Sequence, residues 1–105
     1  MEGLFSPNST EQTRPKAQKL FLEGLIAIND VSLEKALALL LQAEELDPEQ
    51  SGITQAIADA YYALNDYDNA LFYAEYSLTK EPMNPWYRIK LAQILYSQGY
   101  YQSAV

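Results

Sequence analysis

The candidates for acid–base chemistry in this sequence are paired carboxylates. The 105 residues include no Cys and no His, which excludes thiolate nucleophiles, Ser-His-Asp triads and nearly all zinc hydrolase sites. Two close pairs of carboxylates remain, Glu44 with Glu45 and Asp66 with Asp68. Both pairs, together with Asp47, fall on predicted turns and helix ends that we expect to be solvated. We therefore predict no catalytic residue, no metal site and no cofactor, and expect that the protein is not an enzyme.

The overall charge also narrows the choice of partners. The sequence has 7 Lys and Arg against 14 Asp and Glu, a net charge of −7. Nucleic acids and anionic membrane surfaces attract clustered positive charge, so neither is an expected partner. The start of the chain, Met1 to Thr13, lacks the basic and apolar regions of a signal peptide.

The apolar runs are also too short for a membrane span, which needs at least roughly 18 consecutive apolar residues. We expect a soluble protein with no direct membrane insertion. It is cytoplasmic if the chain is complete, and its compartment is unresolved if the chain is a fragment.

Small and apolar residues recur every 34 residues along the chain, the same spacing that separates Pro48 from Pro82. Repeated agreement at one offset is the sign of a repeat architecture, in which each unit buries its apolar face against its neighbours. The other matching sets are Gly24, Ala58 and Ala92; Ala36, Ala70 and Ala104; Leu33, Tyr67 and Tyr101; and Leu37, Leu71 and Val105.

Within each period the pattern predicts two helices. Apolar residues recur at helical spacing over 51–64 and again over 67–81. Asn65-Asp66 interrupts the pattern, and Glu81-Pro82 ends it because the residue before a proline is disfavoured in a helix. The same signals predict helices from Thr13–Pro15 to Asn29, from Ser32 to Asp47, and from Asn84-Pro85 to Gly99, with Gly99 as a left-handed stop.

These features resemble the tetratricopeptide repeat, a helix–turn–helix unit with a period of about 34 residues. Residues 51–84 fit best, as Thr54-x-x-Ile57-Ala58-x-x-Tyr61 followed by Ala70 and Pro82; the other units are 17–50 and a truncated 85–105. The tryptophan position of the family pattern holds Leu20, Thr54 and Arg88, and Glu23 stands at an apolar position. The resemblance implies an all-α fold: a right-handed superhelix, or α-solenoid, of antiparallel helix pairs. It would span residues 15–105, end in an incomplete repeat and follow a flexible segment at 1–14.

The resemblance further implies a concave groove lined by the first helix of each pair. Such a groove would bind a protein or peptide segment, helical or extended. Its candidate lining residues are Phe21, Leu25, Ile28 and Asn29 in the first unit; Gln55, Asp59 and Tyr62 in the second; and Trp86, Ile89, Gln93 and Tyr96 in the third.

Each aromatic candidate also has an interpretation as a packing residue. Tyr61, Tyr67, Tyr73 and Tyr101 lie on or near the predicted apolar stripe, so we assign them to the core. Tyr62, Trp86 and Tyr96 could serve either role, and Trp86 could cover the seam with the preceding unit. Phe21 could be covered by Leu4 and Phe5.

The function predicted from these observations is a protein–protein interaction module or scaffold. Family members that clamp the carboxylate of heat-shock chaperones use Lys, Asn and Arg. Here Phe21, Leu25 and Ala56 occupy clamp positions and only Lys90 matches, which argues against that role. Two alternatives stay open. One is a structural or self-association segment of a longer repeat protein, with a homodimer formed through the incomplete third repeat around Leu91, Leu95 and Ala104. The other is a small chaperone for an apolar secreted partner.

Overall fold

The fold is built entirely from α-helices. The structure is a computed structural model that describes residues 10–99, and no strand occurs among them. The five helices are α1 (Thr10–Asn29), α2 (Leu33–Leu46), α3 (Ser51–Ala63), α4 (Tyr67–Lys80) and α5 (Pro85–Ser97). The predicted all-α class is confirmed. None of the helices in this part of the chain is long and apolar enough to cross a membrane.

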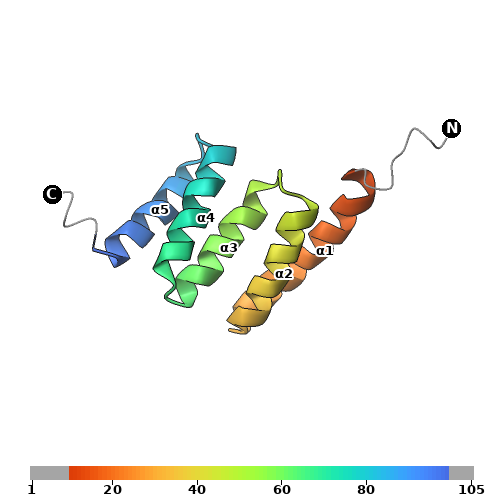
Figure 1. Ribbon diagram of the computed structural model, residues 1–105, viewed down its shortest axis with the longest axis horizontal. Helices are drawn as coiled ribbons and strands as arrows, with labels where there is room; N and C mark the ends of the chain where they lie inside the picture. Colours follow the sequence, from red (N-terminus) through yellow and green to blue (C-terminus); the bar gives the residue numbers. More distant parts are fainter. Residues whose placement is uncertain (1–9, 100–105) are drawn as a thin grey trace.

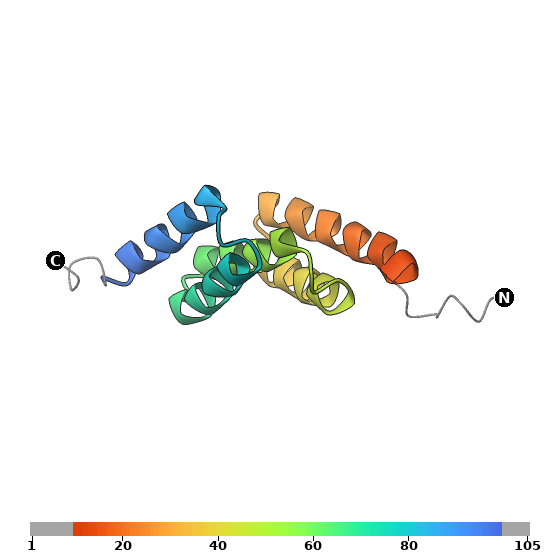
Figure 2. The ribbon, with the colours of Figure 1, turned by 90° about the horizontal axis from the view of Figure 1, so that it is seen from above.

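The helices form an elongated row in which each one runs opposite to its predecessor (Figure 1). The principal extents are 61 × 30 × 18 Å. The closest packing is within two pairs, α1 with α2 and α3 with α4, and further contacts join α2 to α3 and α4 to α5. Seen from above, α1 and α5 lie on one side of the molecule and α2 and α4 on the other (Figure 2). This is the arrangement of a helical repeat; its superhelical hand stays a prediction.

The predicted turns end and start the helices as expected. Asp66 precedes α4, and its carboxylate accepts a hydrogen bond from the Asn69 backbone N–H. Asn84 precedes α5 in the same way, with Pro85 as the first helical residue. Gly99 ends α5 at a φ of +85°, a conformation that residues with side chains rarely adopt. The local signals in the sequence therefore place these boundaries correctly.

Three small residues of the repeat lie where paired helices touch. Gly24 of α1 faces Leu40 of α2 so closely that an added Cβ would lie 2.7 Å from the Leu40 Cδ2. Ala58 of α3 is fully buried with Ala70 of α4. By contrast Ala92, the third member of the Gly24 set, is exposed on α5, and Ala104, Tyr101 and Val105 lie outside the described residues.

Two apolar clusters stabilise the row. One joins the two pairs through α2 and α3; the other joins α3, α4 and α5. Tyr61 and Tyr73 pack against both clusters, as predicted for core residues, with their rings stacked at 5.7 Å. Tyr67 is likewise half-buried, but it lies at the start of α4, where its ring contacts that of Tyr62 and its hydroxyl donates to Asn65. The buried members are Leu40, Ala43, Ile53, Ala56, Ile57 and Ala60 in the first cluster and Ala58, Ala70, Ala74 and Ile94 in the second.

The first helix begins earlier than expected. We predicted a start at Thr13–Pro15 and a flexible segment over 1–14, but α1 begins at Thr10. Pro15 therefore lies inside the helix and not in its first turn. Its ring removes one backbone donor, a cost that a helix of 20 residues can absorb when one face is packed. Leu4 and Phe5, the proposed cover for Phe21, lie outside the described residues.

Candidate binding surface

A hollow between α3 and α5 brings together three of the predicted groove residues. Its walls are Asp59 and Tyr62 from α3 and Lys90, Gln93 and Ile94 from α5, and its volume is about 120 Å³. We call it the α3–α5 hollow. It lies between first helices of successive pairs, where the resemblance placed a groove. A space of this volume admits one side chain or a short piece of backbone, not a folded domain.

Opposite charges meet in this hollow. The Nζ of Lys90 lies 3.6 Å from Oδ1 of Asp59 and 5.1 Å from the centre of the Trp86 ring. The Gln55 amide donates a hydrogen bond of 3.1 Å to the same Asp59 oxygen. Burial raises the pKa of Asp59 above its usual value, although Lys90 and Gln55 act in the opposite direction. The hollow therefore offers both a cation and a carboxylate that is partly removed from water.

Tyr62 lines the hollow and also ties two helices together. Its hydroxyl lies 2.9 Å from the Ser97 hydroxyl of α5, and its ring lies 5.5 Å from that of Tyr67 of α4. Of the two roles that the sequence left open for Tyr62, the structure thus supports packing, without removing the residue from the surface.

Gln55 does not line an open surface, contrary to the prediction. Only 4% of it is exposed, and its Oε1 accepts a hydrogen bond of 2.7 Å from the buried Ser77 of α4. Its Nε2 donates to Asp59. Gln55 is therefore a buried link between α3 and α4. The helical projection placed it correctly on α3, but it could not show that α4 covers that position.

The predicted residues on α5 differ in whether they line the hollow. Gln93 lines the hollow, and Trp86, which is exposed, lies beside it through its contact with Lys90. Ile89 and Tyr96 are also exposed, but they do not line the hollow. Of the four candidates on α5, Gln93 therefore forms part of the hollow and the other three are exposed outside it.

On α1 two of the four predicted residues are packing residues. Phe21 and Ile28 are half-buried against the apolar cluster that joins the two pairs. The Phe21 ring also lies over the first turn of α3, 3.5 Å from where a Cβ on Gly52 would stand. Leu25 is exposed, as is Asn29 at the end of the helix. Of the four candidates on α1, these last two offer surface to solvent.

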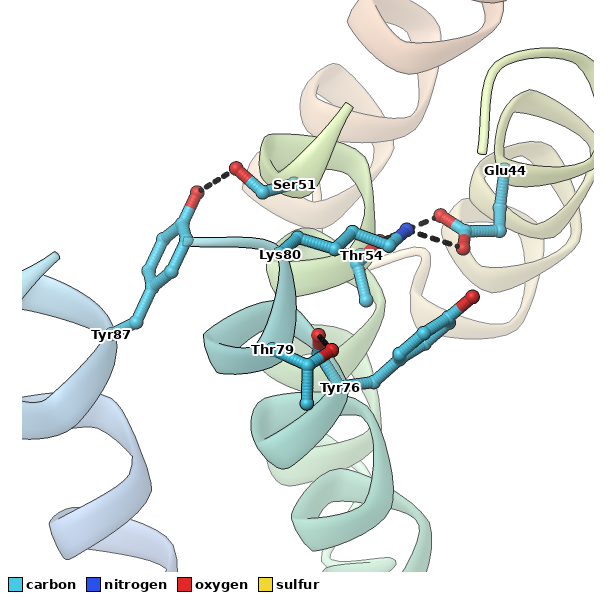
Figure 3. Close-up of polar contacts among 7 residues, drawn as sticks. All are labelled: Glu44, Ser51, Thr54, Tyr76, Thr79, Lys80 and Tyr87. Carbon is cyan, nitrogen blue, oxygen red and sulfur yellow. Dashed lines mark hydrogen bonds and ion pairs between the residues drawn. The ribbon is translucent and has the colours of Figure 1, made fainter. Parts of the chain in front are cut away.

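The largest departure from the sequence analysis is a polar cluster that joins three helices (Figure 3). Lys80 of α4 donates hydrogen bonds of 2.9 Å to Glu44 of α2 and 2.6 Å to Thr54 of α3, and Thr54 donates to Glu44 at 2.8 Å. The Lys80 ammonium also lies 4.4 Å from the centre of the Tyr76 ring. The side chains of Lys80 and Glu44 are only 12% and 15% exposed.

Glu44 is therefore not the solvated helix end that we expected, and neither is Asp47, which is buried. Glu45 and Asp68 are exposed as predicted. The error has a physical cause, because the partners of Glu44 come from 10 and 36 residues further along the chain. Nothing in the local pattern around Glu44 carries that information.

A second polar contact holds α5 against α3. The Tyr87 hydroxyl lies 3.0 Å from that of Ser51, and Ser51 also donates to the carboxylate of Glu81 (Figure 3 shows Tyr87 and Ser51). The Asn84 amide donates to Glu81 as well. These donors hold the pKa of Glu81 below its usual value. Both contacts act in packing, and we assign them no part in binding.

Compared with known proteins, the chain matches no family model and no curated protein sequence. The likeness to the tetratricopeptide repeat therefore rests on the 34-residue spacing, and the helix pairs are compatible with it.

Proposed function

We propose that this protein is an interaction module that binds a polypeptide segment at the α3–α5 hollow and along the neighbouring surfaces of α1 and α5. The observation that carries the proposal is that Asp59, Tyr62 and Gln93, predicted from sequence as lining residues, share one hollow beside the exposed ring of Trp86. Concave sites with aromatic walls and a few polar groups are typical of ligand recognition.

The chemistry of the hollow suits a peptide. Each residue of a peptide backbone other than proline carries one N–H donor and one C=O acceptor. Asp59 can accept from such a donor, whereas Lys90 can donate to such an acceptor, and the side-chain amide of Gln93 can do both. An apolar side chain of the ligand could then lie on the Trp86 ring, since exposed aromatic residues are common anchors of interfaces.

The charge of the protein sets a preference among peptides. With a net charge of −7, the protein attracts basic segments over long distances and repels acidic ones. We therefore expect a partner segment that is neutral or basic and that carries at least one large apolar side chain.

The test is a selection from a displayed library of random peptides on the immobilised protein. A peptide that is recovered is then titrated against the wild type, Trp86→Ala and Gln93→Ala. We expect Trp86→Ala to weaken binding at least tenfold, the loss typical of a central aromatic anchor. Tyr62→Ala is a poorer probe, because Tyr62 also holds α5 through Ser97.

Met83→Ala is the matched control, since Met83 is among the most exposed apolar residues and does not line the hollow. Circular dichroism would check that each variant keeps its helical content. Selected peptides that bind Trp86→Ala and Gln93→Ala as tightly as the wild type would place binding elsewhere and contradict the proposal.

A further inference from the structure

Asp47, which follows α2, is a buried carboxylate without a partner. Only 5% of the residue is exposed. Within residues 10–99 its carboxylate nevertheless accepts no hydrogen bond and forms no ion pair. Removing a carboxylate from water without a compensating partner is costly, so packing alone does not account for an acidic residue at this position.

The corresponding carboxylate of the next unit has partners. The 34-residue spacing aligns Asp47 with Glu81, and Glu81 accepts hydrogen bonds from Ser51 and Asn84. The residue aligned with Ser51 is Ala17, which is fully buried and has no side-chain donor. The first unit therefore lacks the internal donor that holds this carboxylate in the second unit.

A pocket gives the Asp47 carboxylate access to solvent. Its volume is about 270 Å³. Among the described residues, Gln98 Oε1 is the one side-chain polar atom that is both sealed from solvent and unpartnered, so the unpartnered oxygens of Asp47 must reach open space. We call this space the Asp47 pocket; its walls are Arg14 and Gln18 of α1 and Asp47, Glu49 and Gln50 of the turn between α2 and α3.

We propose that the Asp47 pocket binds the guanidinium group of an arginine residue on a partner polypeptide. Asp47 and Glu49 supply two carboxylates to the pocket, and the amides of its two glutamines supply further acceptor oxygens. A guanidinium stays charged at neutral pH and presents several N–H donors in one plane, so it can bond a carboxylate through two donors at once. The ammonium of lysine is more strongly hydrated and lacks this planar geometry, which favours arginine in a shielded site.

The pocket also contains a cation that belongs to the protein. Arg14 lines the pocket but is exposed, and it forms an ion pair with neither Asp47 nor Glu49. Its positive charge opposes the arrival of a second cation, although the net charge of −7 attracts one over longer distances. Arg14 and Asp47 should therefore have opposite effects on binding.

The test is a titration of the isotope-labelled full chain with N-acetyl-arginine methylamide, followed by NMR. We expect saturable shifts of the backbone N–H signals of Glu49 and Gln50, with a dissociation constant of about 1 mM or weaker, because a single side chain is bound. The matched control ligand is N-acetyl-citrulline methylamide, which has nearly the same shape but no charge. It should produce no saturable shift at these residues.

Three variants test the assigned roles. Asp47→Asn should weaken binding of the arginine probe at least about tenfold, since it removes the shielded charge. Arg14→Gln should tighten binding by about two- to fivefold, because it removes a like charge at the surface. Asp30→Asn is the matched control, since Asp30 is exposed, precedes α2 and does not line the pocket. It should leave the affinity unchanged.

Circular dichroism would check that Asp47→Asn stays folded, and the citrulline ligand and Arg14→Gln test the proposal without altering Asp47. The absence of a saturable shift would overturn the proposal, as would equal binding of the citrulline ligand or unchanged binding by a folded Asp47→Asn. Weaker binding by Arg14→Gln would overturn the assigned roles, because Arg14 would then help to hold the probe.

This inference goes beyond the proposed function and does not depend on it. Trp86→Ala and Gln93→Ala alter the α3–α5 hollow, so both variants should bind the arginine probe as tightly as the wild type. Asp47→Asn should likewise leave the affinity for a peptide selected on the hollow unchanged. The two proposals can therefore fail separately.

Discussion

The Lys80 ammonium lies 2.9 Å from the carboxylate of Glu44, a residue 36 positions earlier in the chain. The pair spans α2 and α4, and Thr54 of α3 bonds both partners. Three helices from two successive pairs thus meet at one charged contact that is largely shielded from water. Because α2 and α4 are not joined by a common turn, this contact helps to fix how one pair sits on the next.

We first predict that Lys80→Met destabilises the fold by about 2–3 kcal/mol, because the substitution keeps most of the apolar length of the side chain but leaves Glu44 shielded and without its counter-ion. Glu44→Gln together with Lys80→Met should cost less than the sum of the two single changes, since they remove one shared interaction.

Urea unfolding followed by circular dichroism would measure all three variants. The control is Glu45→Gln, since Glu45 is the exposed neighbour of Glu44 and its loss should change stability by less than about 0.5 kcal/mol. An equal effect of Lys80→Met and Glu45→Gln would show that the contact contributes nothing measurable.

Our second prediction concerns the residues that precede α2 and α4. The Asp66 side chain accepts from a backbone N–H of α4, whereas Ser32 makes no such bond to α2. Asp66→Ala should therefore cost about 1 kcal/mol of stability, the usual value of an N-cap. Ser32→Ala should change the stability by no more than a few tenths of a kcal/mol, roughly. Thermal unfolding of the two variants side by side would decide, and equal losses would mean that the cap bond is not what matters at Asp66.

These examples separate what local sequence can and cannot predict. Helix ends at Asp66, Asn84 and Gly99 depend on a few neighbouring residues, so residue type was sufficient to place them. The close contact at Gly24 was also predictable, because the 34-residue spacing aligns it with Ala58. Periodicity thus carries some information about packing as well.

The roles of the binding-surface residues were harder to predict from sequence, because they depend on which helix covers each residue. Helical projection placed Asp59, Tyr62 and Gln93 around what proved to be one hollow. It could not tell that Ser77 of α4 would cover Gln55. Contacts such as these join residues far apart in sequence, and their energy comes from partners that no local pattern encodes.

Our third prediction is a pH-dependent effect of Asp59. Burial raises its pKa above the ordinary value of 3.8, so the folded state holds this proton more tightly than the unfolded state. The stabilising contribution of the protonated group is complete below pH 3.8 and is lost as pH rises through the raised pKa. Asn has no proton to lose in this range, so the Asp59→Asn variant does not lose stability as pH rises through that pKa. The stability of the variant relative to wild type should therefore increase from about pH 3 toward neutrality and then level off.

Urea unfolding at a series of pH values would test this, with Lys90→Met as a second variant. Lys90 lowers the pKa of Asp59. Removing Lys90 should therefore make the protein lose more stability as pH rises. Wild type and Asp59→Asn curves that run parallel from acid to neutral pH would show that Asp59 does not titrate differently on folding.

Our last prediction compares two glycines inside helices. Alanine is favoured over glycine in a helix by up to about 1 kcal/mol, so either substitution would be stabilising if space allowed. At Gly24 the new Cβ would lie 2.7 and 2.8 Å from two carbons of Leu40, which is itself fully buried. Leu40 cannot move away without disturbing the core, and such overpacking costs about 1–3 kcal/mol. At Gly52 the nearest atom is a Phe21 ring carbon at 3.5 Å, an ordinary contact.

We therefore expect Gly24→Ala to lower the free energy of unfolding by about 1–2 kcal/mol and Gly52→Ala to raise it by up to about 1 kcal/mol. Urea unfolding would measure both, and a stabilising effect of Gly24→Ala would mean that α1 and α2 do not approach one another as closely as Gly24 and Leu40 indicate.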